Sequence, residues 1–303
     1  MIHFDRHAGI KFSNLKMQIA ELSLNNNNFF VTNIDEVYFN EELDFQKDKE
    51  TKLNFILSSA FEELVLKKSI TSNAVSFSLP QELFITSRFK FEPSLLDSDL
   101  KEDFKLQLAI LYPYVNWSEY TIKYFEVDDP APAFENTALI FALNRKVIRL
   151  LANICEKFNF KLNYVDHCHL ASNNLLINEK FETESVNLSF YISQKVLSAL
   201  AARKGKPIYY QDIPLKNINE IPDLITGEVY KLKLLKLNPH QSFLFGENIS
   251  LKISDKLSEL TSLNFNIVNP FTELKAGYEI TANKFYTDAN HLFTASVGTT
   301  IRL

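Results

Sequence analysis

Glycine is scarce in this sequence, with only six residues among 303, although average usage is about 7%. Loops that hold phosphate groups need glycine, because their backbone approaches the ligand closely and often takes positive φ angles. No two glycines here lie within ten residues of each other, so the sequence contains neither a P-loop nor a dinucleotide-binding fingerprint.

Cysteine and long apolar runs are also lacking. The two cysteines, Cys155 and Cys168, imply no disulfide framework and fit a reducing compartment. The N-terminal segment has a charged Asp5 and no long apolar core, so we expect no signal peptide. No apolar run approaches the roughly 20 residues that span a bilayer. We therefore expect a soluble, cytoplasmic protein without direct membrane insertion, which only a partner would hold at the inner membrane.

Positive charge is not in excess either. The net charge is −5, which argues against a nucleic-acid surface. What the sequence does have is apolar material, with 46% hydrophobic and 13% aromatic residues, which is enough for sizeable cores. A length of 303 residues predicts about two domains.

The order of predicted elements repeats along the chain. In the first half, alternation predicts strands within 8–24 and from Phe29, and helical spacing predicts a helix over 53–64. The second half repeats three strands and a helix, at 186–192, 196–203, 207–213 and about 220–235. Strands and helices alternate between the copies, over 137–177. The pattern predicts a mixed α/β fold with two duplicated lobes.

Five segments, in order along the chain, resemble the motifs of a known family. Gly9–Leu22 (GIKFSNLKMQIAEL) is similar to its opening Gly-Ile-Asp-Ile-Gly-Ser hairpin, and Val75–Pro80 (VSFSLP) to a strand that ends in Ala-Leu-Pro. The others are Thr137–Leu176, Ser242–Phe271 and Thr294–Arg302. The family is that of the PilM-like proteins of type IV pilus assembly. It belongs to the actin-like ATPase superfamily and is related to FtsA and to the cytoplasmic domain of GspL.

This resemblance implies a two-lobed actin-like fold made of duplicated ribonuclease H-like halves. Residues 1–178 would form the first lobe, with an inserted PilM/FtsA-type subdomain at about 75–178. Residues 179–303 would form the second lobe, whose C-terminal segment could pack back on the first. Only about thirty residues separate Pro214 from Phe243, so the helical subdomain of the second lobe should be reduced.

The first two nucleotide loops of the family are altered here. Where the first loop carries an Asp that handles Mg²⁺ and then a Gly, this chain has Lys11 and Ser13. In the second loop, Tyr191 and Ser193 stand at the Asp and Gly positions. Without these carboxylates, neither loop would coordinate Mg²⁺ or position an attacking water.

The third, adenosine-facing motif is altered as well. The family's Gly-Gly pair is Gly246-Glu247 here, and a Glu beside phosphates would repel them. We therefore predict a pseudo-ATPase with no catalytic residue and no cofactor. Lys11 alone favours the alternative of a weak ATPase or kinase-like phosphotransferase of the same superfamily, because a lysine can attract an anion.

The tetrapeptide Asp166–His169 (DHCH) is a candidate metal site, because Cys and His bind Zn²⁺. No second Cys/His pair lies at a spacing that would complete such a site, so we interpret the tetrapeptide as structural and expect no metal. We interpret the acidic pair Asp128–Asp129 as a solvated turn.

The function that the resemblance implies is binding. In PilM-like proteins the cytoplasmic tail of a single-span inner-membrane protein, PilN, docks beside the inserted subdomain. We therefore expect a non-catalytic scaffold with a PilN-like partner and, further, an assembly motor ATPase. The candidate contact residues are Phe84, Tyr114 and Trp117, because aromatic side chains dominate interfaces and Trp117 falls in a predicted loop. A further alternative is a lineage-specific actin-like protein unrelated to pili.

Overall fold

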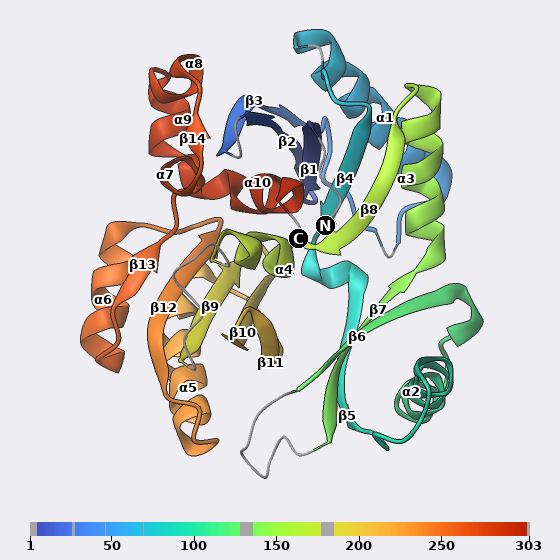
Figure 1. The fold of residues 1–303 in the computed structure, drawn as a ribbon, viewed down its shortest axis with the longest axis vertical. Coiled ribbons are helices and arrows are strands. Elements are labelled where there is room, and N and C mark those ends of the chain that lie inside the picture. The colour runs from blue at the N-terminus through green and yellow to red at the C-terminus, as the bar shows by residue number, and fades with distance from the viewer. Residues whose placement is uncertain are drawn as a thin grey trace.

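The computed structural model describes residues 5–25, 28–45, 47–68, 70–127, 136–176 and 185–301, arranged as two lobes with a smaller unit beside them (Figure 1). The pair Asp128–Asp129 lies outside these residues. The architecture is mixed α/β, as the alternation of predicted strands and helices indicates. In the part of the chain that the structure describes, no helix is long and apolar enough to cross a membrane.

The first lobe is built on a six-stranded sheet with the order β14-β3-β2-β1-β4-β8. Its strands are β1 (Arg6–Phe12), β2 (Lys16–Asn25), β3 (Asn28–Tyr38), β4 (Ala74–Leu79), β8 (Lys161–His167) and β14 (Lys275–Ala276). The first three strands form an antiparallel meander, whereas β4 pairs in parallel with both β1 and β8.

Helices cover both faces of this sheet (Figure 1). On one face, α1 (Glu50–Lys67) and α3 (Arg145–Lys157) pack over alternate, buried residues of β1. On the other face lie α4 (Cys168–Asn173) and α10 (Thr294–Thr300). Because side chains alternate along a strand, Lys11 of β1 points to this second face, which meets the second lobe.

The second lobe repeats the plan with a five-stranded sheet of order β11-β10-β9-β12-β13. Its elements are β9 (Val186–Ile192), β10 (Val196–Arg203), β11 (Lys206–Pro214), η5 (Ile218–Glu220), α5 (Ile221–Leu234), β12 (Pro239–Gly246), α6 (Leu251–Thr261) and β13 (Phe265–Ile267). In the fully described stretch between β11 and β12, α5 and the single turn η5 are the only helices. The helical subdomain of this lobe is therefore reduced, as expected.

A three-stranded sheet of order β5-β7-β6 forms the inserted subdomain. Its elements are β5 (Phe84–Lys90), α2 (Asp97–Leu111), η2 (Trp117–Glu119), β6 (Tyr120–Glu126) and β7 (Thr137–Asn144). Leu100, Phe104 and Leu108, one helical turn apart, pack α2 on this sheet. The separate sheet spans 84–144, less than the expected 75–178, because β4 and β8 pair within the first-lobe sheet.

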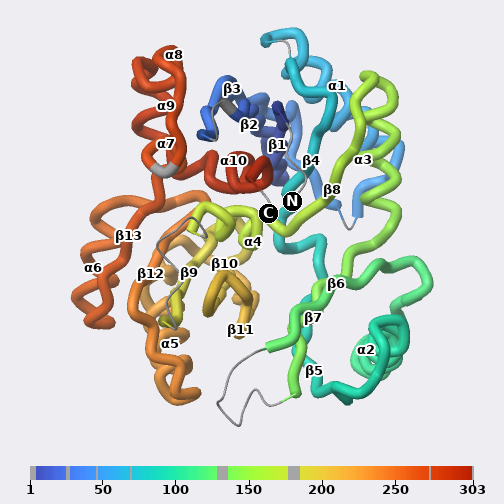
Figure 2. Tube along the Cα trace, in the orientation of Figure 1, coloured from blue at the N-terminus to red at the C-terminus, as the bar shows by residue number. Residues whose placement is uncertain are grey.

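The C-terminal segment returns to the first lobe, and Figure 2 shows α10, in red, beside the blue N-terminal strands. The remaining short helices are η1 (Gln81–Leu83), η4 (Asn174–Leu176), α7 (Pro270–Glu273), α8 (Tyr278–Thr281), α9 (Lys284–Asp288) and η6 (Asn290–Phe293). A Cβ on Gly298 would lie 2.0 Å from Ala171 O, and one on Gly9 would lie 2.2 Å from Ser296 O. Both glycines are therefore required by the close backbone packing of α10.

We predict that Gly298→Ala lowers the free energy of unfolding by about 2 kcal/mol, because the added methyl group would force α10 away from α4. The matched control is Gly227→Ala in α5, where a Cβ meets nothing within 4 Å and alanine favours the helix. Urea unfolding of both variants and the parent chain measures the difference. If Gly298→Ala were as stable as the parent, the packing described for α10 would be wrong.

Candidate functional site

A buried ion pair joins the two lobes in the cleft between them. Lys11 Nζ on β1 donates to Glu247 Oε1, just after β12, and to Gln18 Oε1 on β2, in both cases at 3.1 Å. Only 4% of the Lys11 side chain and 14% of the Glu247 side chain are exposed. The chain's own charges therefore meet where the sequence places two of its altered nucleotide loops.

The ion pair continues as a row of polar groups along the first-lobe sheet. Gln18 Nε2 donates to Glu36 Oε2 at 2.9 Å, and Lys16 Nζ donates to the same oxygen at 2.8 Å. Burial by itself lowers the pKa of Lys16, but the hydrogen bond and charge of Glu36 outweigh burial, so the pKa is raised. Each carboxylate of the row is thus bonded to a lysine of the chain itself.

Glu247 shows the same balance between burial and charge. Burial raises the pKa of its carboxyl group, yet the charge and hydrogen bond of Lys11 lower it by more, and the pKa lies below its usual value. Glu247 is therefore ionised at neutral pH. Its contribution to stability is present above the pH at which an unfolded Glu titrates and is lost as the pH falls through the lowered pKa.

Ser13 and Ser193 hold equivalent hairpin turns in the two lobes. The Ser13 amide donates to Lys16 O between β1 and β2, and the Ser193 amide donates to Val196 O between β9 and β10, each at 2.9 Å. The hydroxyl of Ser13 accepts from the Lys16 amide, and the hydroxyl of Ser193 accepts from the Val196 amide. Both hydroxyls are therefore engaged by their own turns, with the same geometry in each half of the duplication.

Gly246 and Tyr191 serve the packing of the second lobe. Gly246 has a φ of +94°, and a Cβ there would lie 2.2 Å from Ile192 O, so close approach to β9 requires this glycine. The Glu247 amide donates to the same carbonyl oxygen at 2.7 Å. The ring of Tyr191 is buried against His169. A buried phenol thus stands where the family has an acidic side chain.

The Asp166–His169 segment forms the junction between β8 and α4, and His167 belongs to a buried hydrogen-bond network. His167 Nδ1 accepts from the His169 amide at 3.2 Å and so caps α4. Tyr210 OH donates to Asp212 Oδ1 at 2.6 Å, so it accepts from His167 Nε2 at 2.9 Å. These roles place the proton of the His167 ring on Nε2.

His169 is enclosed in the same way. Its ring nitrogens lie 2.7 Å from Ser198 Oγ and 2.9 Å from Ser189 Oγ, both in the second lobe. Burial lowers the pKa of His167 to about 3, and it lowers the pKa of His169 well below its usual value. Both rings are therefore neutral and fully hydrogen-bonded. Within the described residues, no group of three or more His, Cys, Asp or Glu could hold a metal ion.

Asp212 links the second lobe to the inserted subdomain. Its Oδ2 accepts from Thr86 Oγ1 of β5 at 3.1 Å, while Oδ1 accepts from Tyr210. Burial raises the pKa of Asp212 to about 6, although both hydrogen bonds act to lower it. Through His167, Tyr210, Asp212 and Thr86, the two lobes and the inserted subdomain meet at one buried carboxyl group.

Two cavities separate the first lobe from the inserted subdomain, and Phe84 lines both. The larger, of about 580 Å³, is bounded by α1, η1, β5 and the start of α3, with Leu53, Val147 and Leu150 in its apolar lining. The smaller, of about 330 Å³, lies between β6 and β8. A ligand in either cavity would therefore touch Phe84.

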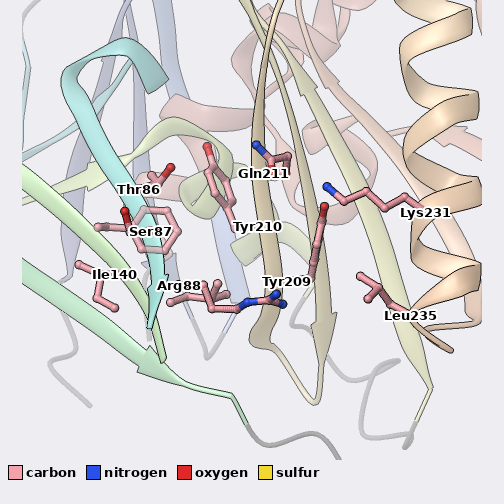
Figure 3. Close-up of a pocket in the computed structure, with 11 residues that line it drawn as sticks. Thr86, Ser87, Arg88, Ile140, Tyr209, Tyr210, Gln211, Lys231 and Leu235 are labelled. Atoms are coloured by element: carbon pink, nitrogen blue, oxygen red, sulfur yellow. The ribbon is translucent and has the colours of Figure 1, made fainter. Parts of the chain in front are cut away.

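A third cavity, also of about 330 Å³, lies between the inserted subdomain and the second lobe. Arg88 of β5, Tyr209 and Tyr210 of β11, and Lys231 of α5 are among its lining residues (Figure 3). The Lys231 ammonium group lies 5.3 Å from the centre of the Tyr209 ring. The sequence gave no signal for this group of residues, because they come from elements that meet only in the fold.

Trp117 is buried in the inserted subdomain. It begins η2, is 7% exposed, and lies near the rings of Tyr112 and Tyr120. The expectation of a loop at Trp117 is therefore wrong, because Asn116 caps a short helix there. Tyr114, by contrast, is fully exposed. The roles of these residues and of Phe84 in partner binding stay predictions.

The comparisons with known proteins identify the fold. No protein-family model and no curated protein sequence matches the chain. The solved structure of a PilM–PilN type IV pilus biogenesis complex matches with a TM-score of 0.78 at 13% identity, covering 98% of this chain and 99% of that chain. A Bacteroides thetaiotaomicron protein with an actin-like ATPase fold matches with a TM-score of 0.53 at 12% identity, covering 89% and 95%. This chain has an actin-like fold.

The expected PilM-like, two-lobed architecture is thus confirmed as a fold. The cytoplasmic domain of EpsL, an inner membrane component of the Vibrio cholerae type II secretion system, has a TM-score of 0.49 at 10% identity, covering 79% of this chain and 82% of that chain. That likeness is too low to carry an argument.

Glu247→Ala should lower the free energy of unfolding by about 3 kcal/mol, because it leaves the buried Lys11 ammonium group without its counter-charge. Lys11→Met combined with Glu247→Gln should cost much less, since no uncompensated charge then remains in the cleft. Urea unfolding at neutral pH measures both. A double variant that is no more stable than the single variant would contradict the description of the pair.

Asp212→Asn is predicted to remove a pH dependence. Because folding raises the pKa of Asp212 to about 6, its contribution to stability is full below the pKa of an unfolded Asp and is lost as the pH rises through about 6. From about pH 5 to about pH 7.5, the parent should lose about 1.5 kcal/mol of unfolding free energy relative to the variant. Urea unfolding at both pH values measures this change, and a constant difference between the two chains would disprove it.

Proposed function

We propose that the chain is a non-catalytic, actin-like scaffold that binds the cytoplasmic segment of an inner-membrane pilus or secretion assembly protein. The observation that carries this proposal is the occupied interlobe cleft, where Lys11 and Glu247 bond to each other. A nucleotide would need a cation free to meet its phosphates and a carboxylate free to meet Mg²⁺. The likeness to the PilM–PilN structure supports the class of partner.

The cavity of about 580 Å³ beside Phe84 is the proposed binding site. Apolar side chains of α1, α3 and β5 and the ring of Tyr120 line it, together with a few polar groups, and such walls suit the apolar side chains of a short segment. A segment bound there would contact both the first lobe and the inserted subdomain. It would hold the chain at the cytoplasmic face of the inner membrane, where an assembly motor ATPase is a further proposed partner.

The alternative functions have less support. Weak ATPase or phosphotransferase activity would need Lys11 to bind phosphate, and Lys11 instead donates to Gln18 and Glu247. A lineage-specific actin-like protein unrelated to pili would have no gene for a single-span PilN-like protein beside its own. The gene neighbourhood therefore distinguishes that alternative from the scaffold.

We predict that the full chain binds a synthetic peptide of the cytoplasmic segment of the neighbouring single-span protein. Val147→Asn, in the cavity wall on α3, should weaken binding about tenfold through lost apolar contact. The matched control is Arg149→Asn on the exposed side of the same helix, which should leave the affinity within about twofold. Binding should change little between about 50 and 500 mM salt, because apolar burial is not screened.

Fluorescence anisotropy of the labelled peptide measures these affinities, and circular dichroism checks that each variant is folded. If the folded parent chain did not bind the peptide at all, the proposed function would be wrong. Equal weakening by Val147→Asn and Arg149→Asn would place the binding site elsewhere on the molecule.

A further inference from the structure

Helix α5 has an apolar outer face in addition to the face that it buries in the second-lobe core. The buried face is formed by Ile221, Ile225, Val229 and Leu232. The outer face carries Asp223, Gly227, Tyr230 and Leu234, at the spacing that places residues along one side of a helix. Tyr230 is 64% exposed and Leu234 is 67% exposed. Two large apolar side chains thus lie side by side on the surface.

Gly227 lies in the middle of this outer face without a packing reason inside the chain. A Cβ added there would meet nothing within 4 Å. Glycine in a helix interior is less stable than alanine, so the fold of the chain alone gives no reason for it. The missing side chain leaves a notch beside Tyr230, and such a notch lets the side chain of a second helix approach closely.

Helix α2 of the inserted subdomain carries a second face of the same kind. Its outer side has Asp99, Asp103, Leu106 and Ile110, at the same spacing as the stripe on α5. Leu106 is 66% exposed and Ile110 is 79% exposed. Beyond the helix end, Tyr114 is fully exposed. Both helices therefore pair a buried face with an apolar surface stripe.

The charges that flank the two stripes are complementary. The first half of α2 is acidic on its outer side, with Asp99, Glu102 and Asp103. The end of α5 is basic, with Lys231 and Lys233 in its last turn. In an antiparallel arrangement the acidic half of α2 would meet the basic end of α5, and the two helix dipoles would also attract each other.

We propose that α2 of one copy packs antiparallel against α5 of a second copy, so that the chain associates with itself. A register that seats Ile110 over the Gly227 notch brings Leu106 beside Tyr230 and Asp103 beside Lys233. Because the two faces differ, the contact forms once between neighbours in a chain of copies or twice around a two-fold axis. The other face of each helix stays in its own core, so association requires no refolding.

Sedimentation velocity of the full chain, from about 1 to 200 µM, tests this proposal. The parent should associate as its concentration rises. Ile110→Lys should weaken association at least tenfold, because it places a charge in the apolar stripe and near the lysines of α5. Leu66→Lys is the matched control, since Leu66 on α1 is similarly exposed, at 78%, and should leave association unchanged.

Substitutions in the notch and in the charged flanks separate the contact from a loss of folding. Gly227→Leu should also weaken association at least tenfold, yet raise the thermal midpoint of the monomer, because the site is open and leucine favours a helix. Asp103→Lys and Lys233→Glu should each weaken association, and the double variant should restore it. A parent that stays monomeric to about 200 µM overturns the proposal, as does association that Ile110→Lys and Gly227→Leu leave intact.

Discussion

Lys11 brings an ammonium group into the contact between the lobes, and a buried charge is stable only with partners close by. Glu247 supplies the opposite charge from the second lobe, and Gln18 supplies a carbonyl oxygen from the first. Because the partners come from both lobes, separating the lobes would break the pair. A phosphate could reach Lys11 only by displacing Glu247, so one interaction ties the lobes together and opposes the binding of a nucleotide.

Further buried bonds act in the same direction. The amide group of Gln81, on η1, donates to Tyr191 O at 3.4 Å and to Ser198 Oγ at 3.2 Å, and Thr86 bonds to Asp212. The two lobes and the inserted subdomain are thereby fixed as one body, in contrast to lobes that close around a ligand. A rigid body loses little conformational freedom when a segment docks in a preformed cavity, which favours binding. A fixed platform therefore suits a scaffold.

Local features of the sequence could be predicted well, and features that depend on distant pairing could not. Alternation and a following proline predict a strand at Ala74–Leu79, which is β4. The extent of the inserted subdomain depends on which strands pair with β4, and no local pattern records this. Asn116 and Glu119, three residues apart, are the cap signal that places Trp117 in a short helix. The roles of Lys11 and Glu247 as partners depend on two residues 236 apart in sequence.

Calorimetric titration of the full chain with Mg-ATP tests the central claim most directly. If the chain's own ion pair occupies the nucleotide cleft, no heat of binding should appear up to about 1 mM Mg-ATP, since ATP would have to break the bond between Lys11 and Glu247. A dissociation constant in the micromolar range would contradict the account, because it would mean that the lobes hold a nucleotide despite the altered loops.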